Sequence, residues 1–112
     1  MKLFIAAMLA SSLVSPAVAG DYYEEMLLCA VKAQAANGIM DARQAGVSMD
    51  TMNEIVASQG LHSTDAAYAN EMVLAAYALK REHAEEDKRR VIDAFQGVVY
   101  LQCTRELREE AE

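Results

Sequence analysis

Two cysteines, Cys29 and Cys103, are the residues of this chain with the clearest capacity for chemistry. A pair of thiols can form a disulfide, share a metal ion, or include a catalytic nucleophile. A zinc site needs clustered ligands and a redox pair needs a Cys-x-x-Cys motif, and the spacing here fits neither. In an oxidising compartment a Cys29–Cys103 bond would close a loop of about 75 residues and stabilise the fold by ~4 kcal/mol. The spacing therefore predicts a structural disulfide, with a metal pair and a catalytic thiol as the alternatives.

Metal ligands are sparse outside the cysteines. His62 and His83 are far apart and match no His-Glu-x-x-His motif. Met49-x-x-Met52 with His62 nearby could bind copper, since thioether sulfur favours Cu(I). The methionines also recur at helical spacing, where methionine is an ordinary core residue. We expect surface histidines, core methionines, and neither a metal site nor a cofactor.

A run of acids could in principle perform acid–base catalysis, because burial can separate the pKa values of paired carboxylates. The run comprises Glu82, Glu85, Glu86 and Asp87, with basic residues on both sides. Glu85 with Arg89 and Glu86 with Arg90 have the i, i+4 spacing of helix-surface ion pairs. This pattern indicates a solvated surface. With no nucleophile motif or phosphate loop in the sequence, we predict no catalytic residues and no enzyme activity.

Three tyrosines are the candidate binding residues: Tyr22 and Tyr23 near the start of the chain, and Tyr100 three residues before Cys103. The expected disulfide would bring these regions together. Tyrosine offers a large contact area at a small cost in conformational entropy. We predict a partner-binding surface at this cluster, and the alternative is that the rings close the open end of the fold.

The first twenty residues have the three parts of a secretory signal peptide. Lys2 gives the positive start, Leu3 to Val14 is a short apolar run, and Ala17-Val18-Ala19 is a small-x-small cleavage site after Pro16. A retained anchor is the alternative, although the apolar run is short for a bilayer. We predict cleavage between Ala19 and Gly20, a single domain over residues 20–112, and a periplasmic or secreted location.

The chain is acidic, with a formal net charge of −7, which becomes −8 when Lys2 is removed. Nucleic acids and anionic membranes are therefore disfavoured as partners. An acidic surface suits a basic protein partner, and a merely solvated surface is the alternative.

The elements that must position these residues are helices, because good helix formers dominate and no proline follows Pro16. We expect a first helix from Asp21 or Tyr22 to about Ala45, stopped by Gly46, with continuation through Asn37-Gly38 favoured over a break there. A short second helix is capped by Ser48 or Asp50, with an offset capping-box candidate at Thr51-x-x-Glu54, and ends at Gly60.

The second half of the chain predicts two more helices. One begins at Thr64 or Asp65, and a turn near His83–Asp87 is preferred over one helix reaching Arg108, which would span roughly 65 Å. The last helix carries Val91 to Leu107, and the charged tail from Arg105 is expected to fray. Both cysteines fall on apolar stripes of the first and last helices. The prediction is an all-α, compact, up-down-like array of about four helices, tied by one disulfide.

The chain resembles a loose group of small exported two-cysteine helical proteins of bacteria and phages, whose activity is not established. The matching residues are Cys29, Arg43-Gln44-Ala45-Gly46-Val47-Ser48, Ala76-Tyr77, and Phe95 with Tyr100 before Cys103. In layout it is also similar to the phage spackle-type periplasmic lysozyme inhibitors, with a second cysteine after Gly97-Val98-Val99-Tyr100-Leu101-Gln102. The cysteines lie farther apart here, and no inhibitory residue carries over.

The second resemblance implies a periplasmic protein that inhibits a cell-wall hydrolase such as a lysozyme, as an immunity or superinfection-exclusion factor. Basic hydrolases would suit the acidic chain. The alternative function is structural or chaperone-like, with an exposed apolar patch formed by Met49, Met52, Ile55 and Val56. The expected state is a monomer or a weak homodimer, with no membrane contact after cleavage.

Overall fold

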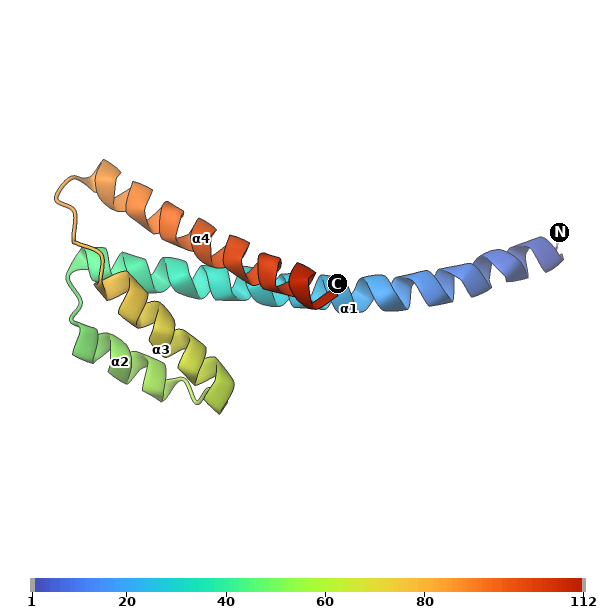
Figure 1. Ribbon diagram of the computed structural model, residues 1–112, viewed down its shortest axis with the longest axis horizontal. Helices are drawn as coiled ribbons and strands as arrows, with labels where there is room; N and C mark the ends of the chain where they lie inside the picture. The colour runs from blue at the N-terminus through green and yellow to red at the C-terminus, as the bar shows by residue number, and fades with distance from the viewer. Residues whose placement is uncertain (1, 112) are drawn as a thin grey trace.

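The computed structural model describes the backbone of residues 2–111 and the side chains of residues 23–110. The chain forms four helices: α1 (Lys2–Ala45), α2 (Met49–Ser58), α3 (Ser63–Tyr77) and α4 (Glu85–Ala111) (Figure 1). The predicted all-α class with about four helices is confirmed.

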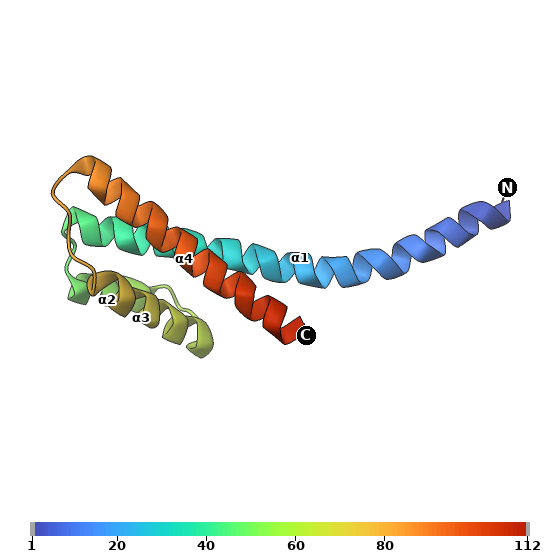
Figure 2. The ribbon, with the colours of Figure 1, turned by 45° about the horizontal axis from the view of Figure 1, so that its top comes forward.

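Successive helices reverse direction, as the up-down prediction requires (Figures 1 and 2). The most extensive packing is between α1 and α4, followed by that of α3 on α1 and α2. From the loop that joins them, α3 and α4 diverge over α1 (Figure 1). Two consequences matter for function: α1 and α4 form a tight antiparallel pair, and α3 and α4 leave space between them.

The disulfide predicted from the sequence is confirmed. Cys29 of α1 and Cys103 of α4 are bonded, with their Cα atoms 5.6 Å apart, and both are buried. The bond joins the first and last helices of the bundle. It therefore holds the α1–α4 pair together over the half of the pair that lies farthest from α2 and α3.

The core lies where α1 meets the other three helices. Its buried members are aliphatic and sulfur-containing: Ala36, Ile39, Met40, Met52, Val56, Ala69, Met72, Val73, Ala76, Ile92 and Val99. The prediction that methionines fill the core is confirmed for Met40, Met52 and Met72. The same burial shows that the predicted exposed patch on α2 is wrong, because Met52 and Val56 are each only 8% exposed and Ile55 alone is well exposed.

The helix boundaries agree with the sequence at most ends. α1 ends at Ala45 and runs unbroken through Asn37-Gly38, and Gly46 follows with a positive φ of 95°. Ser48 rather than Asp50 caps α2, since its Oγ accepts a hydrogen bond from the Thr51 amide at 3.1 Å. α3 begins one residue earlier than expected, at Ser63.

Three boundaries differ from expectation. α1 begins at Lys2 instead of Asp21, because the upstream segment is itself rich in helix-forming residues. The break between the last two helices starts earlier than the predicted turn, since α3 ends at Tyr77 and α4 begins at Glu85. α4 then includes the charged tail as far as Ala111, so the fraying of that tail and the cleavage after Ala19 stay predictions.

Candidate protein-binding surfaces

A buried glutamine ties the α3–α4 loop to the end of α1. Gln44 is only 1% exposed. Its side-chain amide donates to the Lys80 carbonyl at 3.0 Å, and its Oε1 accepts from the Glu82 amide at 2.7 Å. Because a buried amide with both ends satisfied holds the backbone on either side, Gln44 sets the direction in which α4 leaves the loop.

Two of the segments quoted for the first resemblance, residues 43–48 and Ala76-Tyr77, meet at this junction. Arg43 donates from Nε to the Leu79 carbonyl at 3.1 Å, and its guanidinium lies 5.2 Å from the Tyr77 ring centroid. The Tyr77 hydroxyl in turn donates to the Val47 carbonyl at 2.8 Å. A Cβ on Gly46 would stand 3.2 Å from the Arg81 guanidinium, on a backbone that already favours glycine. These residues hold the helices in place, so their role in this chain is structural.

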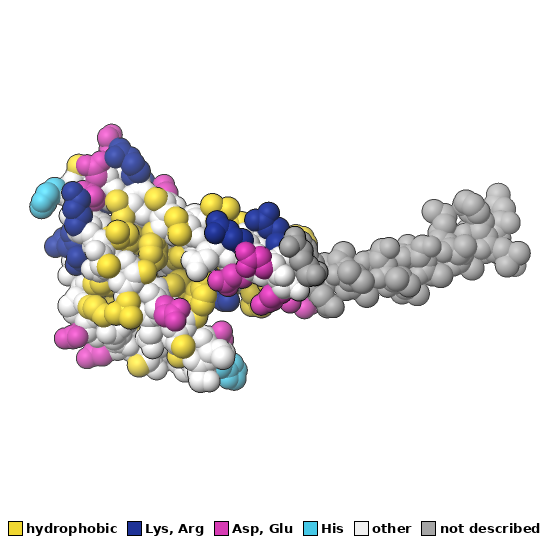
Figure 3. Space-filling view, viewed as in Figure 1, with side chains coloured by type: hydrophobic (Ala, Val, Ile, Leu, Met, Phe, Trp, Pro, Cys, Tyr) yellow, Lys and Arg dark blue, Asp and Glu magenta, His cyan; other side chains and the backbone are white. Residues whose placement is uncertain are grey.

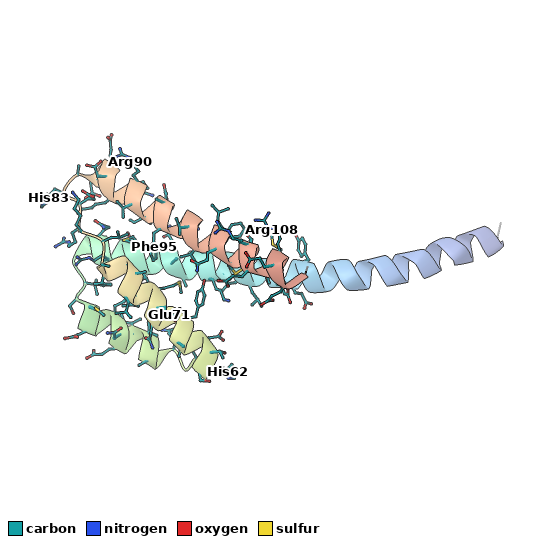
Figure 4. All side chains as sticks on the ribbon, in the orientation of Figure 1. His62, Glu71, His83, Arg90, Phe95 and Arg108 are labelled. Atoms are coloured by element: carbon teal, nitrogen blue, oxygen red, sulfur yellow. A yellow bond between two sulfur atoms is a disulfide. The ribbon has the colours of Figure 1, made fainter. Side chains whose placement is uncertain are left out.

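The two histidines considered as metal ligands are exposed to solvent. His62 lies directly before α3 and His83 lies in the loop between α3 and α4, and both side chains are exposed (Figure 4). Among the side chains of residues 23–110, no three His, Cys, Asp or Glu groups gather in a way that would hold a metal ion.

The acidic run pairs differently from the prediction. Arg90 contacts Asp87 at 2.9 Å and Lys88 contacts Glu85 at 3.5 Å, both at i, i+3 spacing, and Lys80 lies 3.8 Å from Glu82. The predicted i, i+4 pairs, Glu85–Arg89 and Glu86–Arg90, are therefore wrong. On a helix surface i, i+3 neighbours are as close as i, i+4 neighbours, and the ion pairs form at i, i+3 spacing here. All three pairs include an exposed side chain, so each contributes little to stability.

Tyr68 on α3 is the tyrosine with a perturbed environment. Partial burial raises the pKa of its hydroxyl, and the nearby carboxylates Glu106 and Glu71 raise it further. The Lys32 ammonium lies 4.4 Å from the ring centroid. Because the pKa of the Tyr68 hydroxyl is raised, the hydroxyl stays protonated and neutral under physiological conditions. The contact between the Tyr68 ring and Lys32 anchors α3 against α1.

A first candidate surface lies between α1 and α4, on the side where Tyr100 is located. It surrounds a hollow of about 470 Å³ lined by Ala30, Ala33, Gln34, Asp93, Gln96, Gly97 and Tyr100. At one edge Asn37 donates to Gln96 at 2.8 Å. Gly97 keeps the hollow open, because a Cβ there would meet no atom within 4 Å.

Three exposed side chains extend this hollow along α1. Tyr23, Leu27 and Val31 follow one another at intervals of four residues and are 67%, 52% and 64% exposed. Four-residue steps keep side chains on one side of a helix, so the three form a row. We call this row together with the lining of the hollow the tyrosine surface.

The tyrosine surface contains some of the predicted residues and not others. Tyr23 and Tyr100 lie on opposite sides of the disulfide, roughly 14 Å apart along the helix pair, so they do not touch. Leu27 and Val31 occupy the interval. The Tyr22 side chain lies outside the described residues. Leu27 and Val31 were missed, although their four-residue spacing from Tyr23 was the available signal.

A second candidate surface is the groove between α3 and α4, where Figure 3 shows hydrophobic side chains gathered. The groove encloses about 510 Å³ and is lined by Ala75, Leu79, Lys80, Glu82, Val91, Ala94, Phe95 and Val98. A smaller hollow beside Tyr68, Glu71 and Gln102 continues it. Figure 4 labels Phe95 on α4 and Glu71 on α3, on the two sides of this space. The sequence analysis did not identify the groove, because it depends on how far α3 and α4 diverge.

A scan against protein-family models, a search of curated proteins and a search of solved structures each found no match for this chain. Within the part of the chain that the structure describes, no helix combines the length and apolar character needed to cross a membrane.

Proposed function

We propose that this chain is an exported protein-binding domain that inhibits a cell-wall hydrolase such as a lysozyme, as a periplasmic immunity or exclusion factor. The observation that carries the proposal is the tyrosine surface on a disulfide-tied helix pair. It presents aromatic and aliphatic side chains around a hollow of about 470 Å³ on regular helices.

The composition of the tyrosine surface supports protein recognition. Binding hot spots are enriched in tyrosine, and a central hollow ringed by less critical contacts excludes water from the anchor. Tyr23, Leu27 and Val31 are all more than half exposed. Helices joined by a disulfide lose little conformational freedom on binding, which favours affinity.

The charge of this chain indicates that the proposed partner is positively charged. The chain has a formal net charge of −7. Asp93 lines the hollow, and the exposed Glu24 follows Tyr23 on α1. Acids at the edge of an apolar surface steer a positively charged protein toward it and raise the association rate. A basic hydrolase with a cationic rim around its substrate cleft fits this surface, and a bound domain of this size would block the cleft.

The test is inhibition of hydrolysis by the oxidised protein lacking residues 1–19. A panel of basic lysozymes and related wall hydrolases is assayed on peptidoglycan, with and without the protein. Leu27→Ala is expected to weaken inhibition about tenfold or more, since it removes a central apolar contact. Leu74→Ala is the matched control, because Leu74 on α3 is similarly exposed, at 59% against 52% for Leu27.

Two results would contradict the proposal. One is a folded protein that slows no hydrolase in the panel. The other is equal loss of inhibition in the Leu27 and Leu74 variants, which would show that the tyrosine surface is not the contact.

A structural or self-associating role is the second candidate, and the α3–α4 groove favours it. The groove leaves apolar side chains of α4 uncovered, with Val98 60% exposed. Self-association and hydrolase inhibition use different surfaces of the chain, so the two candidate functions are compatible and separately testable.

A further inference from the structure

We propose that two copies of this chain associate through α4 as an antiparallel homodimer, with the α4 of each copy seated along the α3–α4 groove of the other. This inference does not depend on hydrolase inhibition. The residues that line the α4 side of the groove point to a second copy of α4 as its occupant.

The exposed side of α4 carries a regular row of residues, which we call the α4 seam. Its members are spaced by alternating steps of four and three: Asp87, Val91, Ala94, Val98, Leu101 and Arg105. This is the spacing of the contact positions in paired helices. Val98 and Leu101 are 60% and 59% exposed, whereas Ile92 and Val99 face the core. Ala94 is exposed as well, whereas Val91 is partly buried against the core, so the fold leaves three of the four apolar seam residues uncovered.

The order of residues along the seam favours an antiparallel partner of the same sequence. An acid stands at the N-terminal end, four apolar residues follow, and a base stands at the C-terminal end. A two-fold axis at the level of Gln96 sets Val91 against Leu101 of the second copy and Ala94 against Val98. The same axis sets Asp87 against Arg105, once on each side of the dimer.

The charges at the two ends favour the antiparallel over the parallel arrangement. Parallel pairing would bring Asp87 against Asp87 and Arg105 against Arg105, and such like-charge contacts are unfavourable. Asp87 is available for the antiparallel contact, since its present pair with Arg90 joins side chains that are 44% and 73% exposed. Exposed pairs of this kind are weak and exchange readily.

The α3–α4 groove provides the second wall that an incoming helix needs. Val91, Ala94 and Val98 belong both to the seam and to the groove, and Ala75 and Leu79 line the α3 side. Alanine on each side leaves room for a helix to approach closely. The second copy's Leu101 and Val98 would enter the hollow of about 510 Å³, so each copy covers the apolar surface of the other.

The interface is short, with four apolar layers over roughly 15 Å of helix between Val91 and Leu101. A contact of this size is expected to be weak and to depend on concentration. Sedimentation of the oxidised chain lacking residues 1–19, over about a thousandfold range of concentration, should therefore show a monomer–dimer equilibrium.

The first test compares two matched valine variants by sedimentation. Val98→Glu puts a charge at the centre of the seam, and it should abolish the dimer at every concentration. Val31→Glu is the control, because Val31 is 64% exposed on the tyrosine surface and should leave the dimer unchanged. A wild-type chain that stays monomeric throughout, or a Val98→Glu variant that still dimerises, would overturn the proposal.

The second test determines the register by charge exchange. Asp87→Arg and Arg105→Asp should each weaken dimerisation about tenfold, because each sets like charges together twice. The double variant exchanges the two charges and should restore dimerisation to within about threefold of wild type. Circular dichroism confirms that each variant folds. A double variant as weak as the single variants would disprove this register, as would single variants that dimerise like wild type.

Discussion

The tyrosine surface and the α4 seam occupy different, neighbouring faces of α4 and differ in chemistry. The tyrosine surface mixes an aromatic ring, amides and a carboxylate around a hollow beside Tyr100. The seam has only aliphatic side chains between its terminal charges. Mixed surfaces with aromatic anchors are typical of partners that associate and separate, whereas aliphatic helix stripes are typical of contacts between subunits. The difference suggests that α4 carries one surface for another protein and one for its own copy.

The two surfaces also differ in what holds them. The tyrosine surface depends on the α1–α4 pair and lies beside the Cys29–Cys103 bond. The groove beside the seam depends on Gln44, which fixes the loop between α3 and α4. Substitutions at these two supports should therefore separate the surfaces.

Removing the disulfide should have the largest effect. Replacing Cys29 and Cys103 together with alanine is expected to lower the free energy of unfolding by ~4 kcal/mol, because the bond closes a long loop in the unfolded chain. For a domain this small, that is most of the stability expected. Urea unfolding of the double variant beside the oxidised wild type measures the difference. Equal midpoints for the two proteins would show that helix packing alone holds α1 against α4.

Replacing Gln44 with alanine should have the next largest effect. The change leaves the Lys80 carbonyl and the Glu82 amide without their buried partner and creates a small cavity, which together cost ~2–3 kcal/mol. Since Gln44 positions the start of α4, dimerisation should weaken more than hydrolase binding. Gln59→Ala is the control, because Gln59 is an exposed glutamine that belongs to neither surface. A Gln44 variant as stable as wild type would mean that the loop is held instead by the hydrogen bonds from Arg43 to the Leu79 carbonyl and from Arg81 to the residue 44 carbonyl.

Some features of this fold could be predicted from the sequence alone, and others depend on how the helices pack. The disulfide, the end of α1 at Ala45 and the Ser48 cap follow from local chemistry, so they could be predicted. Gln44 could not, since a glutamine in a helix reads as a surface residue unless the loop that covers it is known. The α3–α4 groove was missed for the same reason, because it depends on a tertiary angle. The patch on α2 was wrong because Met52 and Val56 pack on α3, which a stripe on one helix cannot reveal.

Two matched valines sharpen the comparison between the surfaces in a single experiment. Val31→Glu should weaken hydrolase inhibition and leave dimerisation unchanged. Val98→Glu should prevent dimerisation and leave hydrolase inhibition unchanged. A charge placed in a binding contact typically costs about 2 kcal/mol, roughly a thirtyfold loss in affinity, and in the symmetric dimer it occurs twice, so the loss there approaches a thousandfold. Inhibition assays and sedimentation on both variants give four values. Loss of both activities in either variant would mean that the two surfaces are energetically coupled or are one site.

The smallest expected effects come from substituting two helical glycines. These substitutions should stabilise the fold, whereas the preceding ones weaken the fold or a binding contact. Gly38 in α1 and Gly97 in α4 both have open space at the Cβ position, with no atom within 4 Å. Alanine at either site should raise the free energy of unfolding by ~0.5–1 kcal/mol, because glycine is a poor residue for a helix interior. Thermal unfolding measures both gains.

The two glycines then differ in function, because only Gly97 lines the hollow of the tyrosine surface. Gly97→Leu should fill part of that hollow, keep the fold, and reduce hydrolase inhibition, whereas Gly38→Leu should leave inhibition unchanged. Filling is a sharper test than truncation, since it removes no contact that the folded chain makes. If Gly97→Leu is folded and inhibits as well as wild type, the hollow is not where the partner binds, and the exposed row of Tyr23, Leu27 and Val31 alone would have to provide the contact.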